Sequence, residues 1–215
     1  MKKLLATLVS VFFICSTTAM AEIGIGVSAN YANIDTDGKE VELTGDKETT
    51  TASHSNDVLV PEVFVEAIAD NGWTVGFAYI PARELGSKSR TDTSPTADTE
   101  TGDAGTYTAK AEVSNVVQFY TDIPIGPVYA KLGLTAAELK TEEVNPTGTK
   151  YGDENVIGMT VGIGYRNDIL ANSFYKIEAT YTDFEEYKEM DSNSDHRVTA
   201  NTDITSLRLS FGTKF

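Results

Sequence analysis

The chain has 215 residues, of which 40% are hydrophobic, and it carries 17 Lys and Arg against 32 Asp and Glu, a formal net charge of −15. This acidity argues against binding of DNA or RNA, because nucleic-acid binding depends on cationic side chains that neutralise phosphates. The length and the apolar content suit one folded domain, or two small ones, rather than a disordered chain.

The first 21 residues are arranged like a secretory signal peptide. Lys2 and Lys3 precede an apolar run from residue 4 to residue 15, and the small residues that follow end at Ala19-Met20-Ala21. About twelve apolar residues fall short of the roughly 20 that cross a bilayer as a helix. We therefore predict cleavage after Ala21 and export of a domain of residues 22–215. Cys15 is the only cysteine and would leave with the signal, so we expect neither disulfides nor thiolate chemistry.

After the signal, a period of two begins at residues 22–34. Ile23 and Ile25 share one face of this segment, and Gly24 and Gly26 share the other. The alternation recurs in seven further segments, at residues 58–69, 73–81, 107–121, 127–137, 156–166, 175–182 and 207–215. In residues 107–121 we place Val113 on the apolar face. Alternation of this kind is typical of β-strands.

The connections between these segments alternate in length. Short turns are predicted at residues 70–72, 122–126 and 167–172, and long polar stretches lie at 35–57, 82–106, 138–154 and 183–203. Antiparallel strands joined by short turns at one end and long loops at the other are typical of bacterial transmembrane barrels. We therefore predict an all-β fold, an eight-stranded antiparallel up-and-down transmembrane β-barrel, located in the outer membrane of a Gram-negative bacterium.

A soluble barrel of the lipocalin type would show the same alternation with its two faces exchanged. The many glycines on the less apolar face argue against it, because glycine weakens a solvent-facing strand but lets a narrow lumen accommodate its side chains. Apolar-face aromatics also gather at the strand ends, as expected of two membrane interfaces. Those near the short turns are Trp73, Phe119, Tyr165, Tyr175 and Phe215, and those near the long stretches are Tyr31, Tyr79 and Tyr181.

The last nine residues, Leu207-Arg208-Leu209-Ser210-Phe211-Gly212-Thr213-Lys214-Phe215, resemble the closing strand of bacterial outer-membrane proteins. The glycine-alternating segment 156–166 and the sequence Tyr181-Thr182-Asp183-Phe184 are similar to the small barrels of the outer-membrane protein A, X and W types. The resemblance implies that Phe215, with Phe211, is part of the signal read by the barrel-assembly machinery. The A type is also tethered to peptidoglycan by a periplasmic domain, and because the sequence ends at Phe215 we do not expect this tethering role here.

The charges divide between the long stretches and the predicted interior. The four long stretches carry −5, −2, −3 and −5, which sum to −15, the formal charge of the whole chain. The predicted lumenal charges are four acids and six bases: Glu62, Glu66, Glu112, Glu178, Lys110, Lys131, Arg166, Lys176, Arg208 and Lys214. Because unpaired ions are costly in a poorly hydrated lumen, we expect them to pair. Such pairs form either a structural plug or, as proposed for the resembled family, a gate in a narrow conduit for ions or small solutes.

An enzyme is the third alternative, because small outer-membrane barrels include proteases and lipid-modifying enzymes. His54 and His196 are the only histidines, and no recognised catalytic motif surrounds them. The run 191–195 begins like a calcium loop, but His196 and Thr202 replace its required Gly and Glu. We therefore predict no catalytic residues, metal or cofactor, and a structural or cell-surface interaction role for a monomer. Its expected partners are outer-membrane lipids, lipopolysaccharide and an unidentified extracellular ligand.

Overall fold

The computed structural model describes residues 22–43, 47, 49–92, 105–144, 152–190 and 196–215. Within its strands, the side chains of residues 83–88, 90–92, 105, 107, 109–111, 141 and 143–144 lie outside the description. The predicted signal peptide, residues 1–21, is also outside it, as is the run 191–195. Nowhere in the described ranges does a helix occur that is long and apolar enough to cross a membrane.

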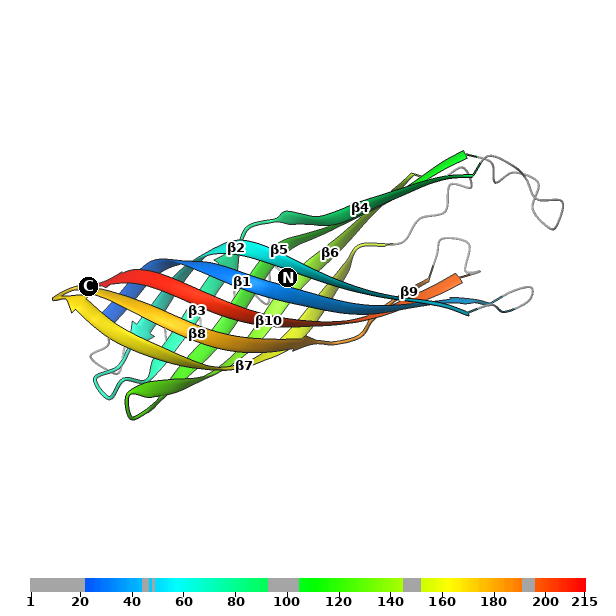
Figure 1. Ribbon diagram of the computed structural model, residues 1–215. Coiled ribbons are helices and arrows are strands. Elements are labelled where there is room, and N and C mark those ends of the chain that lie inside the picture. The colour runs from blue at the N-terminus through cyan, green and yellow to red at the C-terminus, as the bar shows by residue number, and fades with distance from the viewer. Residues whose placement is uncertain (1–21, 44–46, 48, 93–104, 145–151, 191–195) are drawn as a thin grey trace.

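The described chain folds into one antiparallel sheet that closes on itself (Figure 1). Its strands are β1 (Glu22–Glu42), β2 (Thr49–Ile68), β3 (Thr74–Ile80), β4 (Arg83–Asp92), β5 (Gly105–Ile125), β6 (Val128–Val144), β7 (Glu154–Leu170), β8 (Ser173–Phe184), β9 (Tyr187–Met190) and β10 (His196–Lys214). Pairing of β1 with β10 closes the cylinder, and backbone hydrogen bonds between Ile23 and Phe215 join its two ends at the short-turn side.

Two pairs of segments are interrupted single strands, so the ten segments make an eight-stranded barrel. β3 and β4 pair in succession with β5, and β8 and β9 pair in succession with β10. The interruptions fall at residues 81–82 and 185–186, and the first of them contains Pro81, which cannot donate to a sheet. The predicted fold class and strand number are confirmed.

The strands are much longer than a membrane requires. About 9–11 residues of a tilted strand cross a bilayer, whereas β1 has 21 residues and β5 also has 21. Most of the stretch 35–57, predicted as a loop, is instead the continuation of β1 and β2, which pair up to Val41 and Thr49. Beyond Ile80 the wall divides into two flaps, β9-β10-β1-β2 and β4-β5-β6, with no pairing of β2 to β4 in the described chain (Figure 1).

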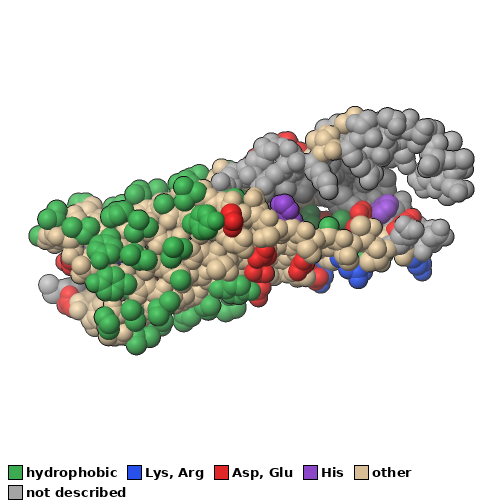
Figure 2. All heavy atoms as spheres, viewed as in Figure 1, with side chains coloured by type: hydrophobic (Ala, Val, Ile, Leu, Met, Phe, Trp, Pro, Cys, Tyr) green, Lys and Arg blue, Asp and Glu red, His purple; other side chains and the backbone are tan. Residues whose placement is uncertain are grey.

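The outer face of the membrane-spanning part is apolar (Figure 2). Exposed side chains there include Val27, Leu132 and Met159, which are 58%, 48% and 67% accessible. Because such a belt is unfavourable in water and favourable in lipid, the barrel spans a membrane. Phe211 lies on this outer face of β10, and Phe215, directly after β10, is also exposed. Their role in assembly stays a prediction.

The aromatic residues predicted at the membrane interfaces lie toward the strand ends, with one exception, while their role at the interfaces stays a prediction. Trp73, Tyr165, Tyr175 and Phe215 lie toward the short turns, and Tyr31, Tyr79 and Tyr181 lie toward the extensions. Phe119 was predicted near the short turns, but it pairs with Phe77, two residues from Tyr79 and four from Trp73. It therefore lies between the two rings, because β5 continues six residues beyond it, to Ile125, before turning.

A β-bulge shifts the alternation of β5. Ser114 pairs with Glu138 and Val117 pairs with Ala136, so two residues of β5 oppose one residue of β6. The bulged Asn115 has a φ of 50°, and its side-chain amide donates to Glu138, as does the hydroxyl of Ser114. These two hydrogen bonds, led by that from Asn115, lower the pKa of the Glu138 carboxyl below its usual value.

The bulge exchanges the two faces of β5 in the residues that precede it, on the side of the strand extensions. Val113, predicted on the outer face, lines the interior, so its neighbour Glu112 belongs to the outer face. The prediction that Glu112 points into the lumen is therefore wrong. The side chain of Lys110 is outside the described part of the chain.

Glycines on the inner face make room for aromatic rings from adjacent strands. A Cβ atom on Gly76 would lie 2.2 Å from the ring of Tyr120, and one on Gly212 would lie 2.4 Å from the ring of Phe174. The same arrangement pairs Phe64 with Gly26 and Tyr129 with Gly164. The glycine alternation in the sequence thus encodes close cross-strand packing of rings inside the barrel.

We predict that Gly76→Ala destabilises the barrel by about 1–3 kcal/mol, because overpacking forces the buried Tyr120 ring to move. The matched control is Gly38→Ala in the β1 extension, where the nearest atom to an added Cβ is 3.5 Å away. Urea unfolding of the protein in lipid vesicles measures both changes. Equal stability of the two variants would contradict the packing described.

Candidate functional site

The half of the lumen nearer the short turns is filled by eight ionised side chains that form one alternating chain. In order, they are Glu62, Arg208, Glu178, Lys131, Asp122, Lys176, Glu66 and Arg166. Successive members are separated by 3.1, 3.7, 3.0, 2.8, 3.4, 2.9 and 2.8 Å. Every interior member of this ion chain therefore contacts two groups of opposite sign.

The ion chain is electrically balanced and almost dry. Four acids against four bases give 4 − 4 = 0, and seven of the eight side chains are at most 7% exposed, the exception being Arg166 at 19%. Its members come from β2, β5, β6, β7, β8 and β10, so it ties opposite walls of the barrel together. Such pairing is required, because an isolated ion in this space would carry a large desolvation penalty.

Aromatic rings occupy the space between the ions. The Lys131 ammonium lies 3.4 Å from the centroid of the Tyr120 ring, and the Arg166 guanidinium lies 3.8 Å from that of Phe174. The Tyr120 hydroxyl donates to Glu66 over 2.9 Å. Cations over ring faces gain further electrostatic stabilisation when both are desolvated. Ions and rings together occupy this half of the lumen.

One member of the ion chain, Asp122, was not predicted, and two described residues predicted in the lumen lie elsewhere: Glu112 on the outer face and Lys214 at the rim. Asp122 was assigned to a turn, but β5 continues to Ile125, and the alternation of Gln118 and Tyr120 extended by two residues would have placed Asp122 inside. Lys214 was predicted in the lumen. It lies at the short-turn rim, where it pairs with Asp168 and Glu22.

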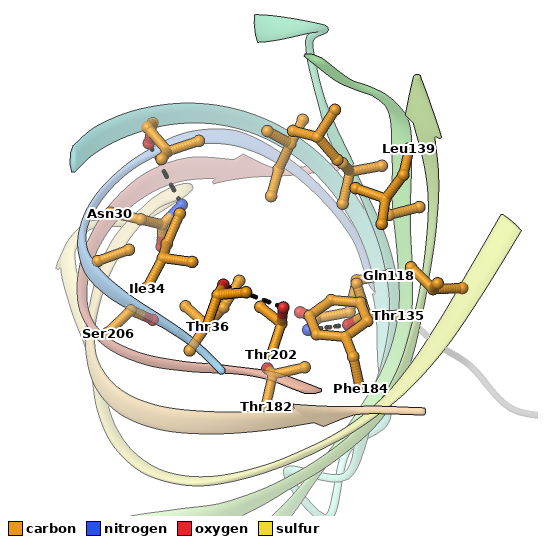
Figure 3. Close-up of a pocket in the computed structure, with 18 of the residues that line it drawn as sticks. Asn30, Ile34, Thr36, Gln118, Thr135, Leu139, Thr182, Phe184, Thr202 and Ser206 are labelled. Carbon is orange, nitrogen blue, oxygen red and sulfur yellow. Dashed lines mark hydrogen bonds between the residues drawn. The ribbon is translucent and has the colours of Figure 1, made fainter. Parts of the chain in front are cut away.

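Above the ion chain the lumen becomes an apolar cavity of about 320 Å³ (Figure 3). Its apolar lining comprises Ala32, Ile34, Val60, Ile80, Val113, Val116, Ala137, Leu139, Val156, Phe184, Tyr187, Ala200 and Ile204. Val116, Ala137, Val156 and Tyr187 are themselves buried and form one packed cluster. The sequence predicted an interior of small, polar and charged side chains, and this apolar cavity was not predicted.

Polar side chains form the floor between the cavity and the ions, and they bond to one another. Arg208 donates to Asn30 over 2.5 Å and to Gln118 over 3.4 Å. Gln118 in turn donates to Thr135 and Thr160, each over 3.0 Å. The hydrogen bonds of the floor are thus made within the floor itself.

The two histidines are not brought together. His54 pairs with Thr36 and His196 pairs with Glu42, positions six residues apart on β1. At about 3.3 Å per residue this separates them by roughly 20 Å along the strand. Among the described residues, no three His, Cys, Asp or Glu side chains are grouped so that they could hold a metal ion.

Comparison with known proteins identifies the fold. Solved structures similar to the chain include the outer-membrane protein AlkL, with a TM-score of 0.50 and 10% identity over 91% of each chain. They also include the outer-membrane protease OmpT from Escherichia coli, with a TM-score of 0.49 and 11% identity over 90% of this chain and 97% of that one. The attachment invasion locus protein Ail of Yersinia pestis matches with a TM-score of 0.34 and 14% identity, over 90% and 99%.

No protein-family model matches the chain, and neither does any curated protein sequence. The closed barrel, its lipid-facing belt and the similarity to AlkL define the class of protein: an integral β-barrel protein of the bacterial outer membrane.

We predict that Glu66→Gln destabilises the barrel by about 3–5 kcal/mol, because it leaves buried cations without their counter-charge. Glu66 is fully buried between Lys176 and Arg166. The matched control is Asp168→Asn at the rim, where the carboxylate is 54% exposed and its loss should cost at most about 1 kcal/mol. Urea unfolding in lipid vesicles measures both, and a smaller loss for Glu66→Gln than for Asp168→Asn would be inconsistent with a structural ion chain.

Proposed function

We propose that the protein is a closed outer-membrane barrel that acts at the cell surface through its long strand extensions. The observation that carries this proposal is the ion chain, which fills the lumen on the short-turn side while the strands continue far beyond the membrane on the other. A lumen plugged by seven ion contacts favours a scaffold for surface interaction over a conduit for solutes.

The charge of the extensions supports partners that carry positive charge. On β1, residues 35–42 hold four acids and one base, and Asp57 adds a further acid on β2. Asp35, Asp203 and Asp183 occupy directly opposed positions on three neighbouring strands, just beyond the outer aromatic ring. Like charges placed this way repel one another, so a cationic partner stabilises them. Cations shared with lipopolysaccharide phosphates are one source of such charge, and cationic groups of an extracellular ligand are another.

The conduit alternative predicts ion conductance, and the proposal predicts none. In planar bilayers the protein should show no steady conductance, because the ion chain leaves no hydrated path. Removing both ions of one contact, in Glu66→Ala with Lys176→Ala, should create conductance or a less stable barrel. Steady conductance of the unaltered protein, lost on Arg208→Ala, would establish the conduit instead.

The surface role is tested by whole-cell binding. Cells that display the protein should bind a fluorescent oligolysine peptide more strongly than cells without it, and the difference should shrink in high salt because exposed charges are screened. Replacing Asp35, Asp183 and Asp203 together with Asn should reduce this difference. Asp70→Asn, in the short turn at the opposite end, is the control and should leave it unchanged. Equal binding by the triple variant would overturn the assignment to these residues.

A further inference from the structure

The apolar cavity in the outer half of the lumen is separate from the ion chain that occupies the other half. It lies above the ion chain, between the two flaps, and its walls come from β1, β2, β3, β5, β6, β7, β8, β9 and β10. We propose that it is a binding site for an uncharged, apolar small molecule of about the size of two fused aromatic rings. This site is additional to the surface role proposed above and does not depend on it.

The size of the cavity sets the size of the ligand. An apolar cavity of about 150 Å³ in a protein core is large enough to bind benzene, and ligand pockets begin at about 300 Å³. The cavity here measures about 320 Å³, roughly twice the benzene-binding volume. A ligand with two fused rings, or a compact aliphatic molecule of similar bulk, therefore fits it.

The lining sets the polarity of the ligand. Val116, Ala137 and Val156 are buried and present only hydrocarbon to the cavity, so water there has few hydrogen-bond partners. Displacing such water with an apolar group is favourable. The close-up in Figure 3 shows Ile34, Leu139 and Phe184 reaching into the same space from different strands.

The floor sets the charge of the ligand. Arg208 lines the cavity, but Glu62 and Glu178 lie 3.1 and 3.7 Å from its guanidinium, and Asn30 and Gln118 accept its hydrogen bonds. Its positive charge is thus already matched on the side away from the cavity. Lys140 also lines the cavity, and its ammonium lies 3.8 Å from the Glu138 carboxylate. An anionic ligand would therefore have to be desolvated without gaining an unpaired cation. A neutral ligand meets no such cost.

The alternation of β6 provides a matched pair of variants. Ala137 is 2% exposed and lines the cavity, whereas its neighbour Ala136 lies on the outer face. Ala137→Phe fills the cavity, and Ala136→Phe adds the same side chain to the lipid side. Ala32→Phe and Ala29→Phe form a second such pair on β1, with Ala32 inside and Ala29 exposed. Heat-modifiable migration on a denaturing gel identifies which variants form a barrel.

The test is a titration of ¹⁵N-labelled protein in lipid nanodiscs with naphthalene, followed by amide chemical shifts. Binding should give saturable shifts at Val116 and Val156, whereas partition of naphthalene into lipid shifts lipid-facing residues such as Leu132 and Met159 without saturation. Ala137→Phe should weaken the saturable binding about tenfold or more, and Ala136→Phe should change it by less than about twofold. If Ala137→Phe forms no barrel, Ala32→Phe against Ala29→Phe gives the same comparison.

Two outcomes would overturn the proposal. One is the absence of saturable shifts at Val116 and Val156. The other is equal weakening by the inward and outward variants. The charge of the ligand is tested with 2-naphthoate, which should bind at least about tenfold more weakly than naphthalene. Tighter binding of 2-naphthoate would contradict the neutral ligand.

Discussion

The rest of the structure depends on the neutralisation of charge inside a narrow lumen. Eight strands leave an interior that side chains can just fill. Eight ionised groups placed there must each contact a group of opposite charge, because unpaired ions carry a large desolvation penalty. The ion chain achieves this by alternation of sign, so that six strands are joined across the barrel. Buried ion pairs add little net stability but are costly to break singly. We therefore expect them to fix the register of the strands, since a strand shifted by one residue would turn its ion toward lipid.

The same constraint separates the lumen into two chemically different halves. Ions and aromatic rings occupy the half near the short turns, where inner-face glycines such as Gly76 and Gly212 leave room for the rings. Beyond Arg208 the inner face carries Val, Ile, Leu and Ala interspersed with Thr, and side chains no longer fill the interior. The strands themselves continue past the membrane, so this apolar half lies between an ionic floor and the acidic extensions. One cylinder thus combines a half that is occupied by ion pairs with an apolar cavity on the side of the strand extensions.

Several features of the fold could be predicted because they depend on local pattern. Strand number, antiparallel order and the choice of outer face follow from a period of two, from turn residues and from the glycines, and all are confirmed by the pairing. The strand ends could not be predicted, because polar strands that pair in water look like loops in sequence. This is why the stretch 35–57 was expected as a loop. Asp122 was left out of the lumen for a different reason, since residues 122–126 contain the turn formers Pro124 and Gly126.

For the candidate site, the sequence determined which residue types lie inside, and seven of the eight members of the ion chain were on the predicted list. Tertiary structure alone decided which acid meets which base, because those contacts join residues far apart in the chain, such as Lys176 and Glu66, which are 110 residues apart, and Arg208 and Glu62. It also decided the bulge at Asn115, which exchanged the inner and outer faces of the preceding part of β5 and so placed Glu112 on the outer face. The bulge also contributes to the apolar cavity, because it turns Val113 inward to line it. A period of two in the sequence gives the face of each residue only relative to its neighbours. A single inserted residue exchanges the two faces, and it is recognised only from the pairing of β5 with β6.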